Sequence, residues 1–363
     1  SYSRVVFAFL LAYTIMNGIS GPLIDRLGTR LGYALCILWW SVASILHVFA
    51  RGAISLGLFR FLLGAGEAGN WPAAIRIVAE WFPEKERALA SGIFNSGSSA
   101  GAILAPPVVA LILLRYGWQY AFLLTGILGF VWLLFWWPLY RAPAAPTELP
   151  APVPAPWALF RTRFVWSFTV AKIFLDPVWY FYIFWFPEYL KNARHFDMAQ
   201  IGKFAWIPFF AAGSGNLLGG MVSGALVKRG MEVTVARKTS VTIFAILMLS
   251  AIPAVLAPSA VWSIAFVSLA MTGYTGSLAS MLSLPADVFP KNAVASVYGL
   301  ASMGSGFGGM LFTLITGWVV EHYSYTPVFI GFGILPLICA TILWTLTRTG
   351  KLFLPEPGLR PPQ

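Results

Sequence analysis

Apolar runs of about 20 residues recur from one end of this 363-residue sequence to the other. A helix of that length is long enough to cross the hydrocarbon core of a bilayer. Residues 31–49 and 126–140 are apolar almost without interruption, whereas the strands of a transmembrane barrel alternate between apolar and polar residues. With 58% hydrophobic and 10% charged residues, the chain is not a soluble globular domain. We therefore expect an all-α, polytopic membrane protein.

Hydropathy predicts eleven membrane helices. They lie near residues 5–24, 32–50, 53–79, 88–114, 118–140, 164–187, 201–227, 239–257, 260–286, 293–320 and 325–347. Their connections form two alternating sets, and fifteen basic residues fall on one set and the C-terminal tail, against about six on the other. The positive-inside rule places the richer set in the cytoplasm. We expect a multi-pass protein of the inner membrane with a cytoplasmic C-terminus and no cleavable signal peptide.

Cysteine, histidine and net charge limit the partners. Cys36 and Cys339 lie singly inside apolar runs, and the three histidines share no ligand spacing, so we expect no disulfide, metal site or other cofactor. A net charge of +11 could indicate a nucleic-acid partner, but the uneven distribution of basic residues favours the positive-inside explanation. The expected surroundings are a lipid bilayer, and the expected state is a monomer without nucleic acid.

A Pro- and Ala-rich stretch near residues 141–156 interrupts the apolar runs. Proline at this density opposes both a helix and a buried strand, so the stretch is interpreted as a cytoplasmic linker. The expected organisation is an N-terminal bundle over 1–140, a linker over 141–163, a C-terminal bundle over 164–347 and a tail over 348–363.

The chain repeats itself across this linker. Residues 79–83 (AEWFP) recur 207 positions later at 286–290 (ADVFP), and residues 21–26 (GPLIDR) recur 203 positions later at 224–229 (GALVKR). At the first offset, three glycines match three others: Gly92, Gly97 and Gly101 with Gly299, Gly304 and Gly308. Gly97 with Gly101, and Gly304 with Gly308, form small-xxx-small pairs that are expected to let helices of opposite halves approach closely. Both copies keep one orientation, which predicts two six-helix bundles related by a parallel repeat. Since five spans precede the linker, we expect the first helix of a twelve-helix protein to be missing.

Four ionisable residues fall inside predicted spans, where charge is unfavourable unless it serves a site. Arg60 and Glu67 are seven residues apart, which places them on one helix face. A guanidinium there suits a carboxylate substrate, and a glutamate can take up and release a proton as a cavity opens and closes. The alternative is an ion pair that only fixes helix packing. Lys172 and Asp176 have the i,i+4 spacing of a neutralising pair, and for these two a packing role is as plausible as substrate contact.

Aromatic and amide side chains add uncharged candidates. Trp179, Tyr180, Tyr182 and Trp185 follow Asp176, and their rings could stack on a sugar or simply pack against neighbouring helices. Tyr13 can offer a hydroxyl to the same cavity. Asn95 and Asn216 are polar candidates for substrate binding, or partners in a hydrogen bond between helices.

The segment 21–30 (GPLIDRLGTR) is the most specific pattern in the chain. Asp25 ends a helix on the cytoplasmic side, where it can cap the positive N-terminus of a helix in the other half. The span beginning near Ala293 is the expected partner. Such a contact, with Arg26 and Arg30 beside it, would hold an inward gate shut. A simple surface turn is the alternative.

These patterns resemble a known family. The 21–30 segment is similar to the signature loop of major facilitator superfamily transporters, and residues 60–72 (RFLLGAGEAGNWP) resemble the fourth helix of the anion:cation symporter family. Residues 172–182 (KIFLDPVWYFY) resemble the seventh helix of its hexuronate transporters.

The resemblance implies a major facilitator fold and proton-coupled uptake of a small organic anion, with a hexuronate as the favoured substrate. In that family, residues matching Arg60 and Tyr13 contact the anion, and the glutamate matching Glu67 carries the proton. Lys172, Trp179, Tyr180, Asn95 and Asn216 complete the expected substrate site. Aldonates, aldarates and aromatic acids are rival substrates, and sodium is a rival coupling ion. A membrane enzyme would need a nucleophile or metal cluster that the spans lack, and a non-transporting sensor of such an anion would need an extra domain.

Overall fold

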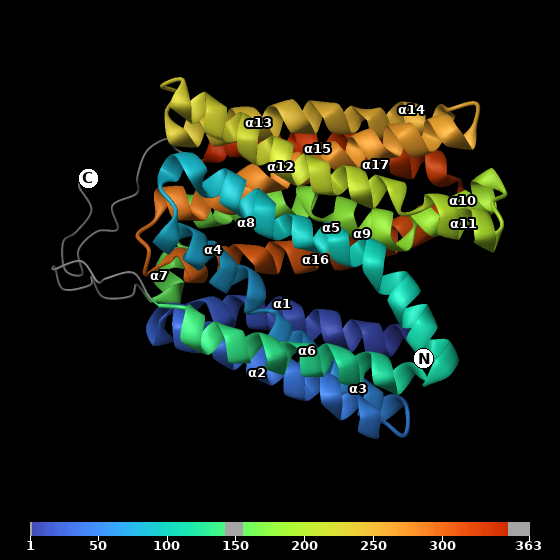
Figure 1. The fold of residues 1–363 in the computed structure, drawn as a ribbon. Coiled ribbons are helices and arrows are strands. Elements are labelled where there is room, and N and C mark those ends of the chain that lie inside the picture. Colours follow the sequence, from blue (N-terminus) through green and yellow to red (C-terminus); the bar gives the residue numbers. More distant parts are fainter. Residues whose placement is uncertain (1, 142–154, 348–363) are drawn as a thin grey trace.

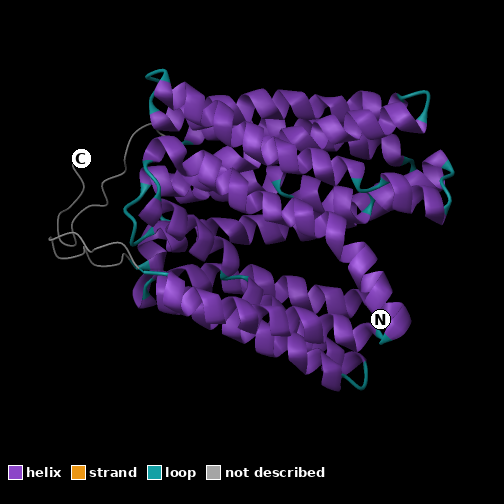
Figure 2. Cartoon of the chain, viewed as in Figure 1, coloured by secondary structure: helices purple, strands orange, loops and turns teal. Residues whose placement is uncertain are grey.

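The computed structural model describes residues 2–141 and 155–347, and this part of the chain consists of helices and loops without a strand (Figures 1 and 2). Before the linker lie α1 (Tyr2–Leu27), α2 (Thr29–Leu46), η1 (His47–Phe49), α3 (Ala53–Glu67), α4 (Asn70–Trp81), α5 (Glu84–Arg115) and α6 (Trp118–Leu139). After it lie α7 (Pro156–Phe160), α8 (Arg163–Leu175), α9 (Pro177–Phe184), α10 (Phe186–Arg194), α11 (Met198–Phe204), α12 (Ile207–Lys228), α13 (Val233–Leu247), η2 (Met248–Ser250), α14 (Ala251–Leu256), α15 (Ala260–Val288), α16 (Val294–His322) and α17 (Tyr325–Leu346).

Nine helical segments of the described chain are long and apolar enough to cross a membrane. The other two predicted spans, 53–79 and 164–187, are each built of consecutive shorter helices, α3 with α4 and α8 with α9 and α10. The predicted linker 141–163 contains the short helix α7, because Pro156 suits the first position of a helix, where an N–H is not needed. Residues 142–154 and the predicted tail 348–363 lie outside the described residues.

The long helices run roughly side by side (Figure 1). The linker end, defined here as the end that carries α7 and the residues bordering the linker, is on the left in that view. The helices before the linker meet those after it mainly where α1 packs on α16 and where α5 packs on α12 and α15. Large apolar side chains such as Ile54 and Leu114 stay exposed on the outside, as a lipid environment requires.

Glycines at two of these crossings let backbones touch. A Cβ atom on Gly92 of α5 would lie 2.2 Å from the carbonyl oxygen of Asn216 on α12, and one on Gly299 of α16 would lie 2.3 Å from that of Asn17 on α1. Gly92 and Gly299 are 207 residues apart, whereas Asn17 and Asn216 are 199 apart. The contacts of the two glycines therefore match α1 with α12 at an offset of 199 residues, whereas the sequence repeat matches them at 203. The difference is about one helical turn.

The prediction that the other four repeated glycines join opposite halves is wrong. A Cβ atom on Gly97 or Gly101 would meet nothing within 4 Å. Gly304 and Gly308 of α16 instead press on the backbone of Thr169 and Ile173 in α8, which lies on the same side of the linker. Four-residue spacing predicted a close helix contact correctly for α16, but it carried no information about the partner.

The span formed by α3 and α4 breaks next to a charged residue. α3 ends at Glu67 and α4 begins at Asn70. Pro72 has no N–H, so the carbonyl of Ala68 loses its usual partner in the helix. Ser20 Oγ on α1 donates to that carbonyl at 3.3 Å. The break is thus stabilised from a neighbouring helix.

A second break occurs at Asp176, the residue that separates α8 from α9. Pro177 occupies the first position of α9, so the carbonyl of Ile173 receives no bond from it. Gly308 lets α16 approach this carbonyl closely. Interrupted membrane helices of this kind are tolerated where they face protein or a polar cavity.

Candidate functional site

A cavity of about 270 Å³ lies midway along the helices. Residues of α1, α3, α4 and α5 line one side, and residues of α8, α9, α15 and α16 line the other. The polar lining comprises Tyr13, Glu67, Asn95, Ser98, Ser99, Lys172, Asp176, Tyr180, Tyr274, Thr275, Tyr298, Ser302 and Ser305. The volume is near the lower end of the roughly 300–1,000 Å³ typical of small-molecule sites, which suits a small polar solute.

Glu67 and Tyr13 form part of the wall on the N-terminal side. Arg60, two turns before Glu67, does not line the cavity, because its guanidinium carbon lies 4.9 Å from the centre of the Phe122 ring on α6. Neither Arg60 nor Glu67 takes part in an ion pair among the described residues. The structure thus brings Glu67, but not Arg60, to the predicted site.

Lys172 and Asp176 form the charged part of the opposite wall. Lys172 Nζ lies 2.7 Å from Asp176 Oδ2 and donates a long hydrogen bond of 3.5 Å to the hydroxyl of Tyr298 on α16. Both charged residues are buried, yet both line the cavity. The expected neutralising pair is therefore present, and it faces the space where a solute would bind.

Aromatic rings complete this wall. Trp179 stacks on Tyr274 with ring centres 5.9 Å apart, and both line the cavity together with Tyr180. The Tyr180 ring packs against Gly309 of α16, where a Cβ atom would lie 2.7 Å from it. Tyr182, in contrast, is buried in the core beside Phe186, so its ring has a packing role.

Asn95 and Asn216 bond to each other across the two halves. Asn95 Nδ2 donates to Asn216 Oδ1 at 2.6 Å, and both side chains are buried. Asn95 lines the cavity whereas Asn216 does not. Of the two roles that the sequence leaves open, the structure contains the interhelical hydrogen bond.

Asp25 joins α1 to α16 at the linker end. Asp25 Oδ2 accepts a hydrogen bond of 2.6 Å from the backbone N–H of Ser296, in the first turn of α16, where unpaired N–H groups favour an anion. Asp25 Oδ1 is paired with Arg76 Nη1 on α4 at 3.0 Å. This is the contact expected for the helix that begins near Ala293.

The two basic residues predicted beside Asp25 do not reach the other half. Arg26 is exposed. Arg30 Nη2 donates to the carbonyl of Trp137 on α6 at 2.6 Å, and its guanidinium carbon lies 4.9 Å from the centre of that residue's ring. Arg30 therefore ties α2 to α6 within the N-terminal helices rather than forming part of a contact between halves.

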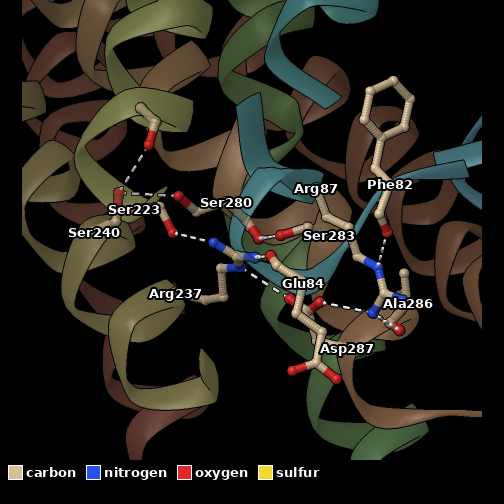
Figure 3. Close-up of polar contacts among 11 residues, drawn as sticks. Phe82, Glu84, Arg87, Ser223, Arg237, Ser240, Ser280, Ser283, Ala286 and Asp287 are labelled. Carbon is tan, nitrogen blue, oxygen red and sulfur yellow. Dashed lines mark hydrogen bonds and ion pairs between the residues drawn. The ribbon is translucent and has the colours of Figure 1, made fainter. Parts of the chain in front are cut away.

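A second polar cluster at the linker end was not expected from the sequence (Figure 3). Asp287 at the end of α15 pairs with Arg87 of α5 at 3.1 Å and with Arg237 of α13 at 2.9 Å. Arg237 also donates to Ser223 Oγ at 2.8 Å and to the carbonyl of Glu84. The cluster connects α5, before the linker, to α12, α13 and α15 after it.

Glu80, the counterpart of Asp287 in the repeat, binds differently. Its Oε1 accepts bonds from Arg76 Nε at 2.8 Å and Thr29 Oγ1 at 2.7 Å, and its Oε2 accepts one from the Tyr140 hydroxyl at 2.6 Å. Burial, followed by this contact with Glu80, raises the pKa of Tyr140 to about 12. Tyr140 thus stays protonated and donating at neutral pH.

One signal in the sequence could have revealed the second cluster. Each copy of the repeated motif carries an acid at the same position, Glu80 in one and Asp287 in the other. Arg87 and Arg237, however, belong to the basic residues of the connections that the positive-inside rule already explains. Their pairing with Asp287 depends on helices that are far apart in the sequence.

Comparison with known proteins gives the family. The sequence matches the Major Facilitator Superfamily over residues 1–301 and 235–361. It is 31% identical to the hexuronate transporter of Escherichia coli strain K12 over 96% of this chain and 85% of the relative, and 33% identical to the galacturonate transporter of Dickeya chrysanthemi over 68% and 78%. A D-galactonate transporter of Escherichia coli strain CFT073 is 28% identical over 93% of this chain and 84% of the relative.

Solved structures agree on the fold. The human organic anion transporter MFSD10 superposes with a TM-score of 0.77 at 16% identity, covering 94% of this chain and 83% of that one. The proton:xylose symporter XylE superposes with a TM-score of 0.75 at 13% identity, covering 96% and 86%. This chain belongs to the Major Facilitator Superfamily. The predicted all-α membrane fold is confirmed, and the chain is a transporter rather than an enzyme. Among the described residues no group of three or more His, Cys, Asp or Glu side chains is placed to hold a metal ion.

Proposed function

We propose that this chain is a symporter that moves a sugar acid, with a hexuronate as the first candidate, together with a proton. The relatives support the substrate class, because they carry hexuronate, galacturonate and galactonate. The observation that carries the proposal is the cavity between the two halves, with Lys172 and Asp176 on one wall and Glu67 on the other.

The charge of the lining supports proton coupling. Two carboxylates and one ammonium, from Glu67, Asp176 and Lys172, are the charged groups of the lining, so the unprotonated wall is net negative and repels an anion. One bound proton makes the lining neutral. Arg60 adds a positive charge two turns behind Glu67. One proton and one monovalent anion together therefore leave this region neutral, which favours their joint passage.

Glu67 is the better candidate for the proton. Asp176 already has a cationic partner, because Lys172 Nζ lies 2.7 Å from its Oδ2. Glu67 has no ion pair among the described residues and lies beside a helix break at the cavity wall. Protonation of Glu67 would then permit the anion to approach Lys172.

The polar clusters at the linker end support alternating access. Both the Asp25 contact with Ser296 and the Asp287 cluster join helices before the linker to helices after it. We propose that the protein lies in the inner membrane with its linker end facing the cytoplasm. We also propose that the protein is closed at that end. Rocking of the two halves would break both contacts and open the cavity at the linker end.

Replacing Glu67 with Gln tests the coupling. In proteoliposomes, radiolabelled glucuronate should accumulate in the parent protein when a proton gradient is imposed, with competition from galactonate and little from benzoate. Glu67→Gln should abolish this accumulation but spare exchange of glucuronate across the membrane, because the anion site remains while the proton site is lost.

Glu321→Gln is the matched control, since Glu321 is exposed near the end of α16 and should leave accumulation unchanged. Normal proton-driven accumulation in Glu67→Gln would contradict the assignment. Accumulation driven by a sodium gradient in place of a proton gradient would identify the rival coupling ion.

A further inference from the structure

One oxygen of Asp176 has no hydrogen-bond partner. Oδ2 is paired with Lys172 at 2.7 Å, but Oδ1 is buried and accepts no hydrogen bond from any described residue. Asp176 as a whole is only 6% exposed, and it lines the cavity. A buried carboxylate oxygen without a donor is unfavourable, since it has lost water and gained nothing in return. Because Asp176 lines the cavity, a ligand there would supply the missing donor once the carboxylate turns Oδ1 toward it.

The backbone around Asp176 is held tightly, so the residue cannot move away to find another donor. Pro177 fixes the first turn of α9. Gly304, Gly308 and Gly309 allow α16 to press against α8 and α9, and a Cβ atom at any of the three would lie within 2.8 Å of an atom of those helices. The carboxylate itself can still rotate and turn Oδ1 toward the cavity.

Lys172 supplies the complementary group at the same point. Its ammonium has three N–H donors, of which one meets Asp176 and one makes the long contact with the Tyr298 hydroxyl. A remaining donor is available for an anion. Lys172 Nζ and Asp176 Oδ2 are 2.7 Å apart. The anionic group of a ligand that binds Lys172 and the donor group of the same ligand that binds Asp176 must therefore be close neighbours.

We propose that Asp176 is a specificity-determining residue that accepts a hydrogen bond from a hydroxyl near the carboxylate bound by Lys172. The pair would then recognise a hydroxy acid as a unit, through one anion and one donor. This inference rests on the proposed function, because it assigns the sugar acid to the same cavity. In the ring form of a hexuronate, the hydroxyl at carbon 4 lies two carbons from the carboxylate carbon and fits this requirement.

The test compares glucuronate with 4-deoxyglucuronate. Binding of each acid to the purified full chain would be measured by intrinsic tryptophan fluorescence, since Trp71 and Trp179 line the cavity, and by competition against radiolabelled glucuronate in proteoliposomes. The parent protein should bind glucuronate about 10- to 100-fold more tightly, as expected for a hydrogen bond to a charged group. In Asp176→Ala that ratio should fall to within about threefold.

Two further variants make the result specific. Asp176→Asn keeps the size of the side chain and should give an intermediate ratio, because a neutral acceptor binds a hydroxyl more weakly. Asp197→Ala removes an exposed aspartate of α11's N-cap, outside the cavity, and should keep the parent ratio. The ratio of the two affinities is the readout, because removal of the carboxylate that pairs with Lys172 alters the affinity for both acids together.

The outcomes separate the two proposals. Equal binding of the two acids by the parent protein, or an unchanged ratio in Asp176→Ala, overturns the role of Asp176 and leaves sugar-acid transport intact. A parent protein that binds neither acid overturns the proposed function and this inference with it. If Asp176→Ala fails to fold, the isosteric Asp176→Asn provides the test, and a parent-like ratio in that variant overturns the role of Asp176.

Discussion

At the scale of the residue, each buried charged side chain in the described part of the chain has a specific partner. Arg237 is completely buried and bonds to Asp287, to Ser223 and to the carbonyl of Glu84. Arginine remains charged wherever it lies, so burial without partners would be strongly unfavourable. Lys172 follows the same rule with Asp176. Oδ1 of Asp176 is an exception, because it has no hydrogen-bond partner among the described residues, and the proposed ligand contact rests on it.

The pair formed by Asn95 and Asn216 gives a prediction at this scale. Asn95→Ala removes a 2.6 Å hydrogen bond between the halves and leaves the Asn216 amide without a partner. A double-mutant cycle with Asn216→Ala should give a coupling energy of roughly 0.6 to 1.7 kcal/mol, the range for such bonds in membrane proteins.

The measurement is thermal or denaturant unfolding of the purified protein in detergent. Ser96→Ala is the control, because the Ser96 hydroxyl bonds only to the carbonyl of Ile93 in its own helix, and it should change stability little. A coupling energy near zero between Asn95 and Asn216 would show that the bond contributes nothing to holding the halves together.

At the scale of the element, small residues and helix breaks determine where backbones meet. Gly92 on α5 and Gly299 on α16 occupy equivalent crossings with α12 and α1. The breaks at 68–69 and at Asp176 place Glu67 and Asp176 at the cavity wall. In both breaks a proline removes a backbone donor. Ser20 donates to the carbonyl freed at the first break, and Gly308 lets α16 approach the carbonyl freed at the second.

Two alanine substitutions on the same helix test the crossing. Gly92→Ala would place a Cβ atom 2.2 Å from the carbonyl oxygen of Asn216, so α5 and α12 would have to separate at about 1 to 3 kcal/mol of stability. Gly97→Ala meets nothing within 4 Å, and it should be neutral or slightly stabilising because alanine favours a helix.

Transport rate and melting temperature measured on both variants distinguish the two cases. We expect Gly92→Ala to lower both quantities, whereas Gly97→Ala should match the parent. Equal behaviour of the two variants would mean that the crossing of α5 and α12 is not tightly packed during transport.

At the scale of the whole molecule, two polar clusters join the two halves at the linker end. Asp25 connects α1 and α4 to α16, and Asp287 connects α5 to α13 and α15. Both must separate if the halves rock apart at this end. Asp25 and Asp287 are therefore the two carboxylates whose contacts between the halves would have to break.

Asp287→Asn should shift the protein toward a state open at the linker end. The substitution leaves the guanidinium groups of Arg87 and Arg237 without their shared carboxylate, and breaking a buried pair in this way costs about 3–5 kcal/mol. The free energies of a transporter's conformations differ by only a few kcal/mol, so the closed state should no longer be the most populated one.

Labelling of a cavity cysteine measures this shift. Ser98→Cys, in a chain with Cys36 and Cys339 replaced by serine, lines the cavity and should react with an impermeant thiol reagent from the linker side only after Asp287→Asn. Arg26→Gln is the control because Arg26 is exposed. If Asp287→Asn still reacts only from the far side, the cluster does not act as a gate.

The sequence by itself determined the spans, the family, the position of Glu67 and Lys172 near a polar site, and the contact of Asp25 with the start of α16. These features depend on local properties: apolar runs of membrane length, charges inside them, and a motif confined to ten residues at 21–30. Hydrophobicity and helix geometry act over one or two turns, so a single sequence contains them fully.

Only the tertiary structure decided which of these groups meet. Arg60 shares a helix face with Glu67 but turns to Phe122, Asn216 binds Asn95 instead of lining the cavity, and Gly304 packs within its own half. Arg87 and Asp287, which are 200 residues apart in the sequence, become ion-pair partners. The physical reason is that such contacts depend on the rotation and depth of helices that pack against one another, and this packing is a property of the whole bundle.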